Sequence, residues 1–523
     1  MKKITLLIFI VVFSNCQSVE QYNSKINDLI AAEKLQGDVD FTYQKLQSLQ
    51  PKLYWYIAKE KLDFKFDSLK KSIQNPMTSF DFYKKLAVVT NSIGQGHLYL
   101  YPKTKRYSKK QTKTIAKKGI GPLSQFEFEV FNDKLYVVKN KSYNKKIKIG
   151  AEVVSINNEN SSSLLTEFKK FFTSDGYNKT LQQHGLSKRF STFYGNKYGI
   201  LDSLKYEFKN GDSLKTMVIK RKNVDSILNP KPKIILTQIQ KEAQKQLLKT
   251  QKKAKAEKDY FRGYDKENKR YNRNLTFQTK DSSIAVIKIN GFSIGGYRNC
   301  YKTFFEKIKA YKSKTLILDL RNNGGGRLAE IENLYSYLAE NDYIFTKPAE
   351  VASKTSMFQM NYFSGSPLWL KPLQIAAAPI FYPFLFFKVR KGQDGKWYTN
   401  RQGKPKKLAE NNFKGKIYVL INGGSFSASS IISSNLKGSK RAYFVGEETG
   451  GAYNGTVAGQ MPLVKLPNSE VKIRIGLIVC TPFFQTEQEG RGIFPDTEII
   501  PTVKNRVEAI DPEMAWILKD ISK

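Results

Sequence analysis

The chain contains very little histidine and cysteine, and this scarcity limits the chemistry it can perform. Among 523 residues there are two histidines, His97 and His184, and three cysteines, Cys16, Cys300 and Cys480. Three widely spaced cysteines cannot form a disulfide framework, and they lack the paired spacing of a zinc site. A histidine-rich metal centre is also disfavoured.

Acidic residues are few relative to basic ones. Lys and Arg number 87 and Asp and Glu 46, which leaves a formal net charge of +41. Such a charge favours polyanions as neighbours, for example nucleic acid, anionic lipid or acidic envelope polymers. With 40 % hydrophobic residues, the chain has enough apolar material to fold, and its length predicts about three to four domains.

The N-terminus lacks an apolar run long enough to span a bilayer. Lys2 and Lys3 precede an apolar run of about ten residues, which is typical of a secretory signal peptide. The run ends at Cys16 in a segment that resembles a loose bacterial lipoprotein box. We therefore expect export to the bacterial cell envelope, with a lipid on Cys16 as outer-membrane anchor or with simple secretion to the periplasm. Export argues against a nucleic-acid partner.

The rest of the sequence changes its hydrophobic pattern several times. Helical spacing dominates first, short alternating runs follow, and apolar runs alternate with helical spans towards the C-terminus, which predicts an α/β fold class. The expected parts are a signal peptide (1–16), a helical region (17–115), a β domain (116–225), a Lys-rich helical linker (226–280) and an α/β core (281–523). In the core we expect strands at 284–289, 315–320, 416–421, 442–445 and 473–479, and helices at 301–312, 327–340 and 428–436.

Two segments differ from their surroundings. Residues 231–280 contain 15 Lys or Arg and 5 Asp or Glu, a composition typical of a solvated helix or linker, with docking to anionic lipid or polymer as the alternative. Residues 375–389 are almost wholly apolar but are interrupted by Pro379 and Pro383 and are too short to span a membrane. They are expected to form a buried connection or a lid, with a membrane-dipping loop as the alternative.

The strongest local signal is a strand that ends in glycine and serine. Residues 417–430 are consistent with a buried strand, a Gly-Gly turn and the start of a helix. A serine at a helix N-terminus lies where free N–H groups and the helix dipole stabilise a developing oxyanion. This arrangement suits a nucleophile, but Ser425, Ser427 and Ser429 are equally explained as helix caps when the segment is taken alone.

A second strand runs into a glycine-rich loop. Residues 316–326 end in three consecutive glycines, Gly324 to Gly326. Glycines allow backbone N–H groups to approach a substrate closely, as an oxyanion hole or anion cradle requires. The Gly-Lys-Ser/Thr ending of a phosphate loop is missing, and a tight structural turn also explains the segment when it is taken alone.

Together these segments resemble the tail-specific (C-terminal processing) serine protease family. The resemblance covers roughly residues 80 to 505 and rests on motifs that occur in the family's order. They are Gly94-Gln95-Gly96-His97-Leu98, the turn at 150–157, the glycine loop at 319–326, the nucleophile segment Ser427-Ala428-Ser429, and the blocks at 446–451 and 489–496. The resemblance implies a crotonase/ClpP-like ββα core at 281–523 as the peptidase domain, with an inserted PDZ-like domain at 116–225.

The family's Ser-Lys branch has a general-base lysine directly after the block at 446–451, where this chain has Ala452-Tyr453-Asn454. Another group must therefore accept the proton of the serine. The tricorn-like branch uses a histidine instead, and the motif around His97 precedes the PDZ-like module in the same order. That branch also tends to have a hydroxyl beside the histidine, where this chain has Gly96.

The resemblance implies acyl transfer, in which Ser427 attacks a peptide carbonyl and His97 moves the proton. This mechanism requires no metal or organic cofactor. Glu489, or its neighbour Glu487, is expected to orient the relay. The oxyanion hole is assigned to the backbone N–H groups of Gly325, Gly324 and Ala428, and His184 is expected on the surface.

The expected function is a serine-type endopeptidase of the cell envelope that acts on unfolded or C-terminal protein segments. The expected partner is a protein or peptide substrate, bound in part by strand addition to the PDZ-like module, while the oligomeric state is left open. Because non-proteases share the core fold, an inactive member that binds peptides or apolar ligands in the same cleft is the alternative. A basic envelope protein that holds anionic polymer through the linker is a third hypothesis.

Overall fold

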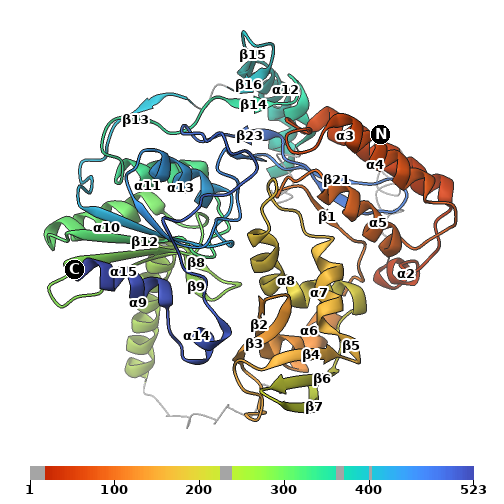
Figure 1. Ribbon diagram of the computed structural model, residues 1–523, viewed down its shortest axis with the longest axis horizontal. Helices are drawn as coiled ribbons and strands as arrows, with labels where there is room; N and C mark the ends of the chain where they lie inside the picture. The colour runs from red at the N-terminus through yellow and green to blue at the C-terminus, as the bar shows by residue number, and fades with distance from the viewer. Residues whose placement is uncertain (1–17, 224–237, 361–369, 400–402) are drawn as a thin grey trace.

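The computed structural model describes residues 18–223, 238–360, 370–399 and 403–523 (Figure 1). The expected signal peptide and Cys16 lie outside the described residues. The described part is a mixed α/β protein, which confirms the predicted fold class. Segments far apart in the sequence, from Gly96 to Cys480, line one of its cavities.

The N-terminal helices are α2 (Val19–Ser24), α3 (Ala32–Leu49), α4 (Lys59–Lys71) and α5 (Ser79–Asn91). Their buried apolar residues recur at helical spacing, and α5 is capped by Thr78, whose hydroxyl accepts a hydrogen bond from the N–H of Asp81. Strand β1 (Tyr99–Tyr101) follows and pairs with β22 (Lys472–Arg474), which pairs in turn with β21 (Leu463–Lys465). This pairing ties the chain directly after His97 to the C-terminal part of the protein.

The next unit is an antiparallel sheet in the order β2-β3-β4-β6-β7. Alternate residues of its first strand are buried, as the sequence pattern predicts. Its strands are β2 (Phe126–Phe131), β3 (Lys134–Asn140), β4 (Glu152–Ile156), β6 (Ser203–Asn210) and β7 (Ser213–Lys220), with the short β5 (Glu159–Asn160) on β4. The associated helices are α6 (Lys109–Lys117), η1 (Leu123–Gln125), α7 (Ser161–Lys169) and α8 (Thr180–Tyr198). The PDZ-like character of this unit stays a prediction.

A long exposed helix, α9 (Gln238–Arg262), and the small hairpin of β8 (Tyr264–Asp265) and β9 (Arg270–Tyr271) lead to the core sheet. The core sheet has the order β10-β11-β12-β18-β19-β24 and is parallel except for β10. Its strands are β10 (Arg273–Phe277), β11 (Ile284–Ile289), β12 (Thr315–Asp319), β18 (Lys416–Ile421), β19 (Tyr443–Gly446) and β24 (Thr497–Glu498).

Alternate residues of these strands enter two separate cores, which explains why the sequence shows continuous apolar runs. Leu316 and Leu318 face the core that includes residues of α10 (Tyr297–Ala310), α11 (Leu328–Ser336) and α13 (Ala428–Gly438). Ile317 and Leu420 face the core beneath α15 (Pro512–Ile521). Figure 1 shows these helices on opposite faces of the sheet, with α14 (Val503–Val507) near α15.

A second sheet, in the order β15-β16-β14-β23-β20, lies between the core and the N-terminal helices (Figure 1). Its strands are β14 (Ala349–Val351), β15 (Val389–Lys391), β16 (Trp397–Thr399), β20 (Thr456–Ala458) and β23 (Ile478–Cys480), while β13 (Tyr343–Ile344) and β17 (Pro405–Lys406) form a separate ladder. The single strand expected at 473–479 is wrong, because β22 and β23 belong to different sheets. Their separation occurs at Gly476, where a side chain would lie 2.5 Å from the backbone oxygen of Val457.

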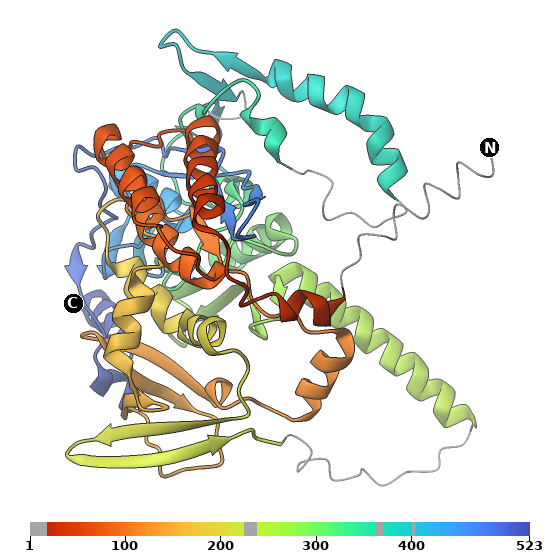
Figure 2. The ribbon, with the colours of Figure 1, turned by 90° about the vertical axis from the view of Figure 1, so that its right-hand side faces the viewer.

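The apolar insert forms a continuous helix, α12 (Lys371–Lys388), which projects from the body in Figure 2. The expectation of a buried, proline-interrupted connection is therefore wrong. One side of the helix contacts η3 (Ser356–Gln359) through rings such as those of Tyr382 and Phe358. Its large apolar residues are nevertheless mostly exposed, among them Leu373, Ile375, Ile380, Phe384 and Phe387. Within the described ranges, no helix has both the length and the apolar character needed to cross a bilayer.

Candidate active site

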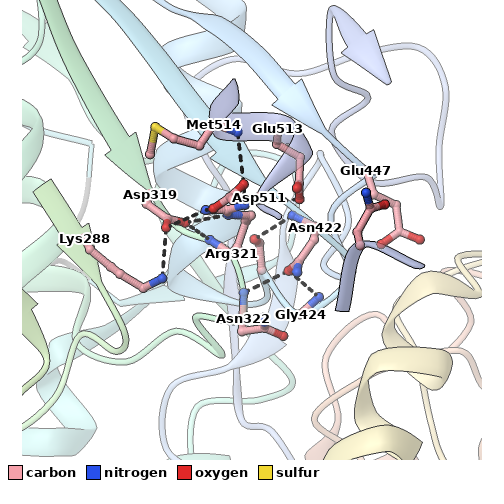
Figure 3. Close-up of polar contacts among 12 residues, drawn as sticks. Lys288, Asp319, Arg321, Asn322, Asn422, Gly424, Glu447, Asp511, Glu513 and Met514 are labelled. Carbon is pink, nitrogen blue, oxygen red and sulfur yellow. Dashed lines mark hydrogen bonds and ion pairs between the residues drawn. The ribbon is translucent and has the colours of Figure 1, made fainter. Parts of the chain in front are cut away.

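Two loops that follow neighbouring parallel strands meet at the edge of the core sheet. β12 and β18 run side by side with Asp319 opposite Leu420, so their carboxyl ends lie together. The side-chain oxygen of Asn422 accepts hydrogen bonds from the N–H of Asn322 at 2.8 Å and from the N–H of Gly424 at 3.0 Å (Figure 3). Asn422 thus joins the glycine-rich loop to the serine loop.

Asp319 and Arg321, at the start of the glycine-loop motif, have a structural role. The Arg321 guanidinium donates hydrogen bonds to Asp319 at 3.0 Å and to Asp511 at 2.7 and 2.8 Å, and it forms an ion pair with Glu513 at 3.2 Å (Figure 3). Lys288 pairs with Asp319 on the other side at 3.1 Å. Because Asp511 and Glu513 lie at the start of α15, this network fixes the base of the loop to the C-terminal helix.

The structure distinguishes the three serines of the second loop. Ser425 and Ser429 are fully buried, and their hydroxyls donate to the carbonyl oxygens of Leu320 and Asn323, each at 2.8 Å. Ser427 lines a cavity instead, and its side chain does not cap α13. The two buried serines hold the loops together, and Ser427 alone of the three is placed to react.

Ser427 has an unusual backbone conformation, with φ 59° and ψ −118° at the entry to α13. A residue other than glycine rarely adopts positive φ, and such strain persists only where surrounding contacts impose it. Gly325 is part of those surroundings, because a Cβ atom at that position would lie 2.7 Å from the Cβ of Ser427. The glycine allows the two loops to approach this closely.

Ser427 and His97 line the same cavity, which has a volume of about 840 Å³. The ring of His97 stacks on that of Phe426 with the centroids 4.6 Å apart, next to Ser427 in the chain. His97 is only 7 % exposed. Burial, with a smaller contribution from Arg474, lowers the pKa of His97 to about 3, so the imidazole is neutral at physiological pH.

His97 is connected to a buried carboxylate through a hydroxyl group. Its Nδ1 atom lies 3.1 Å from Oγ1 of Thr456, and this Oγ1 lies 3.2 Å from a carboxylate oxygen of Asp175. The same carboxylate oxygen accepts a hydrogen bond from the N–H of Gly96 at 2.8 Å. Burial raises the pKa of Asp175 to about 6, although these donors act in the opposite direction.

The order of these groups determines which nitrogen of His97 has the proton. An ionised carboxylate only accepts hydrogen bonds, so Thr456 donates its single hydroxyl proton to Asp175. The Thr456 oxygen then accepts the Nδ1–H of His97, and Nε2 is left with a free lone pair. This is the tautomer that a general base requires.

Sequence reasoning missed both Thr456 and Asp175. Gly96 lacks a hydroxyl, and the structure provides one from Thr456, which lies 359 residues further along the chain. A lone threonine in β20 and an aspartate in a loop have no local pattern that would single them out. The nearest sequence signal is the short spacing of Thr456 from the block at 446–451.

Glu489 and Glu487 are exposed and are not among the residues that line this cavity. The carboxylate of Glu489 accepts a hydrogen bond from Nε1 of Trp55 at 3.2 Å. Among the described residues, no hydrogen bond or ion pair joins Glu489 or Glu487 to His97 or Ser427. The role expected for Glu489 therefore stays a prediction.

His184 also lines the cavity, and the expectation that it lies on the surface is wrong. Its Nε2 lies 2.6 Å from a carboxylate oxygen of Glu447, which also accepts the N–H of Gly423 at 3.1 Å. The reason is that α8 packs against the serine loop, so that Cδ2 of His184 would be only 2.6 Å from a side chain at position 423. Two histidines thus lie along one cavity.

The three N–H groups expected to form an oxyanion hole differ in their surroundings. The N–H of Gly325 donates to the side-chain oxygen of Asn323 at 3.0 Å. Gly324 lines the cavity, and nothing lies within 4 Å of a Cβ atom built on it. Ala428 is the first residue of α13, where N–H groups have no acceptor within the helix. The assignment of the three groups stays a prediction, with Gly324 and Ala428 the freer donors.

In the part of the chain that the structure describes, His, Cys, Asp and Glu do not gather in a group of three suited to a metal ion.

Residues 283–499 match the family model Peptidase family S41. No curated protein sequence matches the chain.

Two solved structures of CPAF have a similar fold. Mature CPAF has a TM-score of 0.54 and 14 % identity, with 91 % of this chain and 94 % of that chain covered. Mature CPAF complexed with lactacystin has a TM-score of 0.56 and 13 % identity, with 94 % of this chain and 97 % of that chain covered. At these identities the likeness concerns the fold alone. The family match covers the two loops that hold Ser427 and the glycines, and it identifies residues 283–499 as a serine peptidase region of family S41.

Proposed function

We propose that the protein is an endopeptidase in which Ser427 is the nucleophile and His97 the general base. The observation that carries this proposal is the placement of His97 in the cavity of Ser427, with Thr456 3.1 Å from its Nδ1. Ser425 and Ser429 are engaged with backbone carbonyl groups, so they do not compete for the role.

The reaction is acyl transfer through a covalent acyl-enzyme. The Ser427 oxygen attacks the peptide carbonyl carbon while Nε2 of His97 accepts the hydroxyl proton, and N–H groups of Gly324 and Ala428 face the oxyanion. His97 returns the proton to the leaving amine. Water then hydrolyses the acyl-enzyme by the same proton transfers.

Thr456 and Asp175 act as positioning residues in this scheme. When His97 takes up the proton of Ser427, its positive charge lies one hydroxyl group away from the Asp175 carboxylate. The carboxylate therefore stabilises the imidazolium and holds its ring in orientation. A buried pair of this kind is more effective than an exposed one because little water screens it.

The finer features of the function are proposals from the sequence pattern. Export to the cell envelope and a lipid on Cys16 are supported by the lysines and the apolar run that precede this cysteine. Unfolded or C-terminal protein segments are proposed as substrates, because an extended chain can enter the cavity at Ser427 and pair with a strand of the β2–β7 sheet.

A second candidate is a protein that binds peptides in the cavity without cleaving them. The observation that favours it is the position of Glu489, whose carboxylate contacts Trp55 rather than His97. Within the peptidase function, His184 is an alternative general base, because it lines the same cavity and is paired with Glu447.

The test is cleavage of an unfolded protein by the purified protein, compared with its Ser427→Ala, His97→Gln and His184→Gln variants. Fragments are identified by mass spectrometry, and a fluorophosphonate probe reports the reactivity of Ser427. The proposal expects cleavage and labelling by the parent, loss of both in Ser427→Ala and His97→Gln, and retention in His184→Gln.

The reverse result for the two histidines would assign the base to His184. Peptide binding by the parent without cleavage or labelling would support the binding protein.

A further inference from the structure

The cavity that contains Ser427 and His97 has a strongly cationic lining. Its charged residues are Lys188, Arg189, Arg327 and Arg474, and the described residues that line it include no aspartate or glutamate. Lys188 and Arg189 come from the face of α8 that also carries His184, one helical turn earlier. Arg474 comes from β22, which pairs with the strand that follows His97.

Three of these four cations lack a carboxylate partner. Arg327 pairs with Glu330 at 2.8 Å. For Lys188, Arg189 and Arg474, no ion pair within 4.0 Å is found among the described residues, although ion pairs are frequent elsewhere in this part of the chain. The chain therefore leaves positive charge uncompensated in the cleft, while many of its surface lysines are paired.

Neutral groups hold the three cations in place. The Lys188 ammonium donates to the carbonyl oxygen of Asn322 at 3.0 Å, and Nε of Arg474 donates to the carbonyl oxygen of His97 at 3.1 Å. The Arg189 guanidinium lies 5.4 Å from the centroid of the Tyr99 ring. Each cation is thus positioned without being neutralised, as a binding site for an anion requires.

The charges also act on one another. Burial, together with the positive charges of Arg270 and Arg189, lowers the pKa of Lys188 to about 8, although the carboxylate of Glu129 acts in the opposite direction. A bound anion would relieve this repulsion. In a concave, partly buried cleft such charges attract an oppositely charged ligand more strongly than on an open surface.

We propose that Lys188, Arg189 and Arg474 bind a carboxylate of the peptide substrate, so that the enzyme selects anionic peptide segments. The inference rests on the proposed peptidase function, because the ligand must extend to Ser427. A guanidinium binds a carboxylate with two parallel hydrogen bonds, and Arg189 and Arg474 provide two such groups. The carboxylate is either an Asp or Glu side chain or the free C-terminus of the peptide.

The cations belong to the binding surface rather than to the reacting atoms. Their loss is therefore expected to raise KM with little effect on kcat. Peptides rich in Lys or Arg should bind poorly. Added salt should weaken binding of the carboxylate peptide more than binding of a neutral one.

The experiment measures peptide binding to the full chain with the Ser427→Ala substitution, so that the result does not depend on turnover. Four labelled peptides of one sequence are compared by fluorescence anisotropy. The first peptide has Glu at the varied positions and an amidated C-terminus, and the second has Gln at these positions and a free C-terminus. The third, which is the neutral reference, has Gln and an amidated C-terminus. The fourth has Lys and an amidated C-terminus. We expect the neutral amidated peptide to bind about tenfold more weakly than at least one carboxylate peptide.

The comparison of the first two peptides identifies which carboxylate is bound. Arg189→Gln and Lys188→Gln are each expected to remove most of the preference, as is Arg474→Gln. The matched controls, Lys307→Gln on α10 and Lys519→Gln on α15, each remove one positive charge from an exposed lysine outside the cavity and should leave the preference unchanged. Thermal unfolding of each variant verifies that it is folded.

Equal binding of all four peptides would overturn the inference. A preference that survives the three cavity substitutions, or is lost equally in the Lys307→Gln and Lys519→Gln controls, would overturn it as well. If the parent cleaves none of the peptides but the Ser427→Ala chain shows the preference, the peptidase function fails and the carboxylate site stands.

Discussion

The imidazole of His97 and the carboxylate of Asp175 are bridged by one hydroxyl group, that of Thr456, at 3.1 and 3.2 Å respectively. All three side chains are buried. The bridge gives His97 the orientation and the tautomer of a general base without a direct carboxylate–imidazole contact.

Replacing Thr456 tests the bridge directly. Thr456→Val keeps the shape of the side chain but removes the hydroxyl, so kcat should fall by about ten- to a hundredfold. Thr456→Ser restores the hydroxyl and should recover most of the activity. Steady-state kinetics of the two variants checks this, and equal loss in both would point to packing rather than to the hydrogen bonds.

The bridge also predicts the pH dependence of kcat/KM. Burial raises the pKa of Asp175 to about 6, whereas His97, with a pKa lowered to about 3, stays neutral throughout. Activity should therefore be full above pH 6 and fall about tenfold per unit below it, as Asp175 takes up a proton and ceases to be a pure acceptor. In Asp175→Asn this acid limb should vanish and the plateau should be lower. An unchanged limb would exclude Asp175 as its source.

Asp175→Asn should also change stability in a pH-dependent way. The folded-state pKa of Asp175, about 6, exceeds its ordinary value of 3.8, so this group stabilises the folded state below pH 3.8 and loses that contribution as the pH rises through 6. The asparagine variant lacks this loss. Relative to the parent, its free energy of unfolding should therefore increase by about 2 kcal/mol between pH 4 and 7. Denaturant unfolding at both pH values measures the difference, and a constant difference would contradict the expectation.

The two acidic candidates can be separated by matched substitutions. Glu489 contacts Trp55, whereas Asp175 is joined to His97 through Thr456. Glu489→Gln should consequently reduce kcat less than Asp175→Asn does, and Glu487→Gln serves as the control in the same loop. A larger loss in Glu489→Gln would restore the relay role that the family resemblance implies for Glu489.

Substitution of Ser425 and substitution of Ser427 should have different effects on stability and on activity. Ser425→Ala removes a fully buried hydroxyl that donates to Leu320, so it should lower the free energy of unfolding by about 1–2 kcal/mol. Ser427→Ala removes no such bond and should abolish activity with little change in stability. Denaturant unfolding and fluorophosphonate labelling of both variants test this contrast, which equal destabilisation would refute.

The core strands and the helices between them follow from local patterns in the sequence. Apolar runs such as 315–320 correspond to β12, and the expected helix at 428–436 corresponds to α13. These patterns are readable because a strand buried on both faces needs continuous apolar residues, and a helix that follows a Gly-Gly turn needs small residues at its start.

The motifs likewise locate Ser427 and His97, because each is part of a contiguous stretch that resembles a family pattern. Local patterns do not, however, reveal which charges remain unpaired. The cationic lining of the cavity arises because α8 and β22 bring Lys188, Arg189 and Arg474 together without a carboxylate. For the same reason the sequence did not predict the exposure of α12, which depends on how much of its surface other elements cover.

By itself, then, the sequence determined the α/β core, the serine loop, the glycine loop and the candidate base. Only the tertiary structure decided that Thr456 and Asp175 support His97, since these residues come from segments 359 and 281 residues apart along the chain. Secondary structure is encoded by residues within a few turns or strands of one another. A buried hydrogen-bonded relay depends instead on the packing of distant segments, which leaves no local pattern in the sequence.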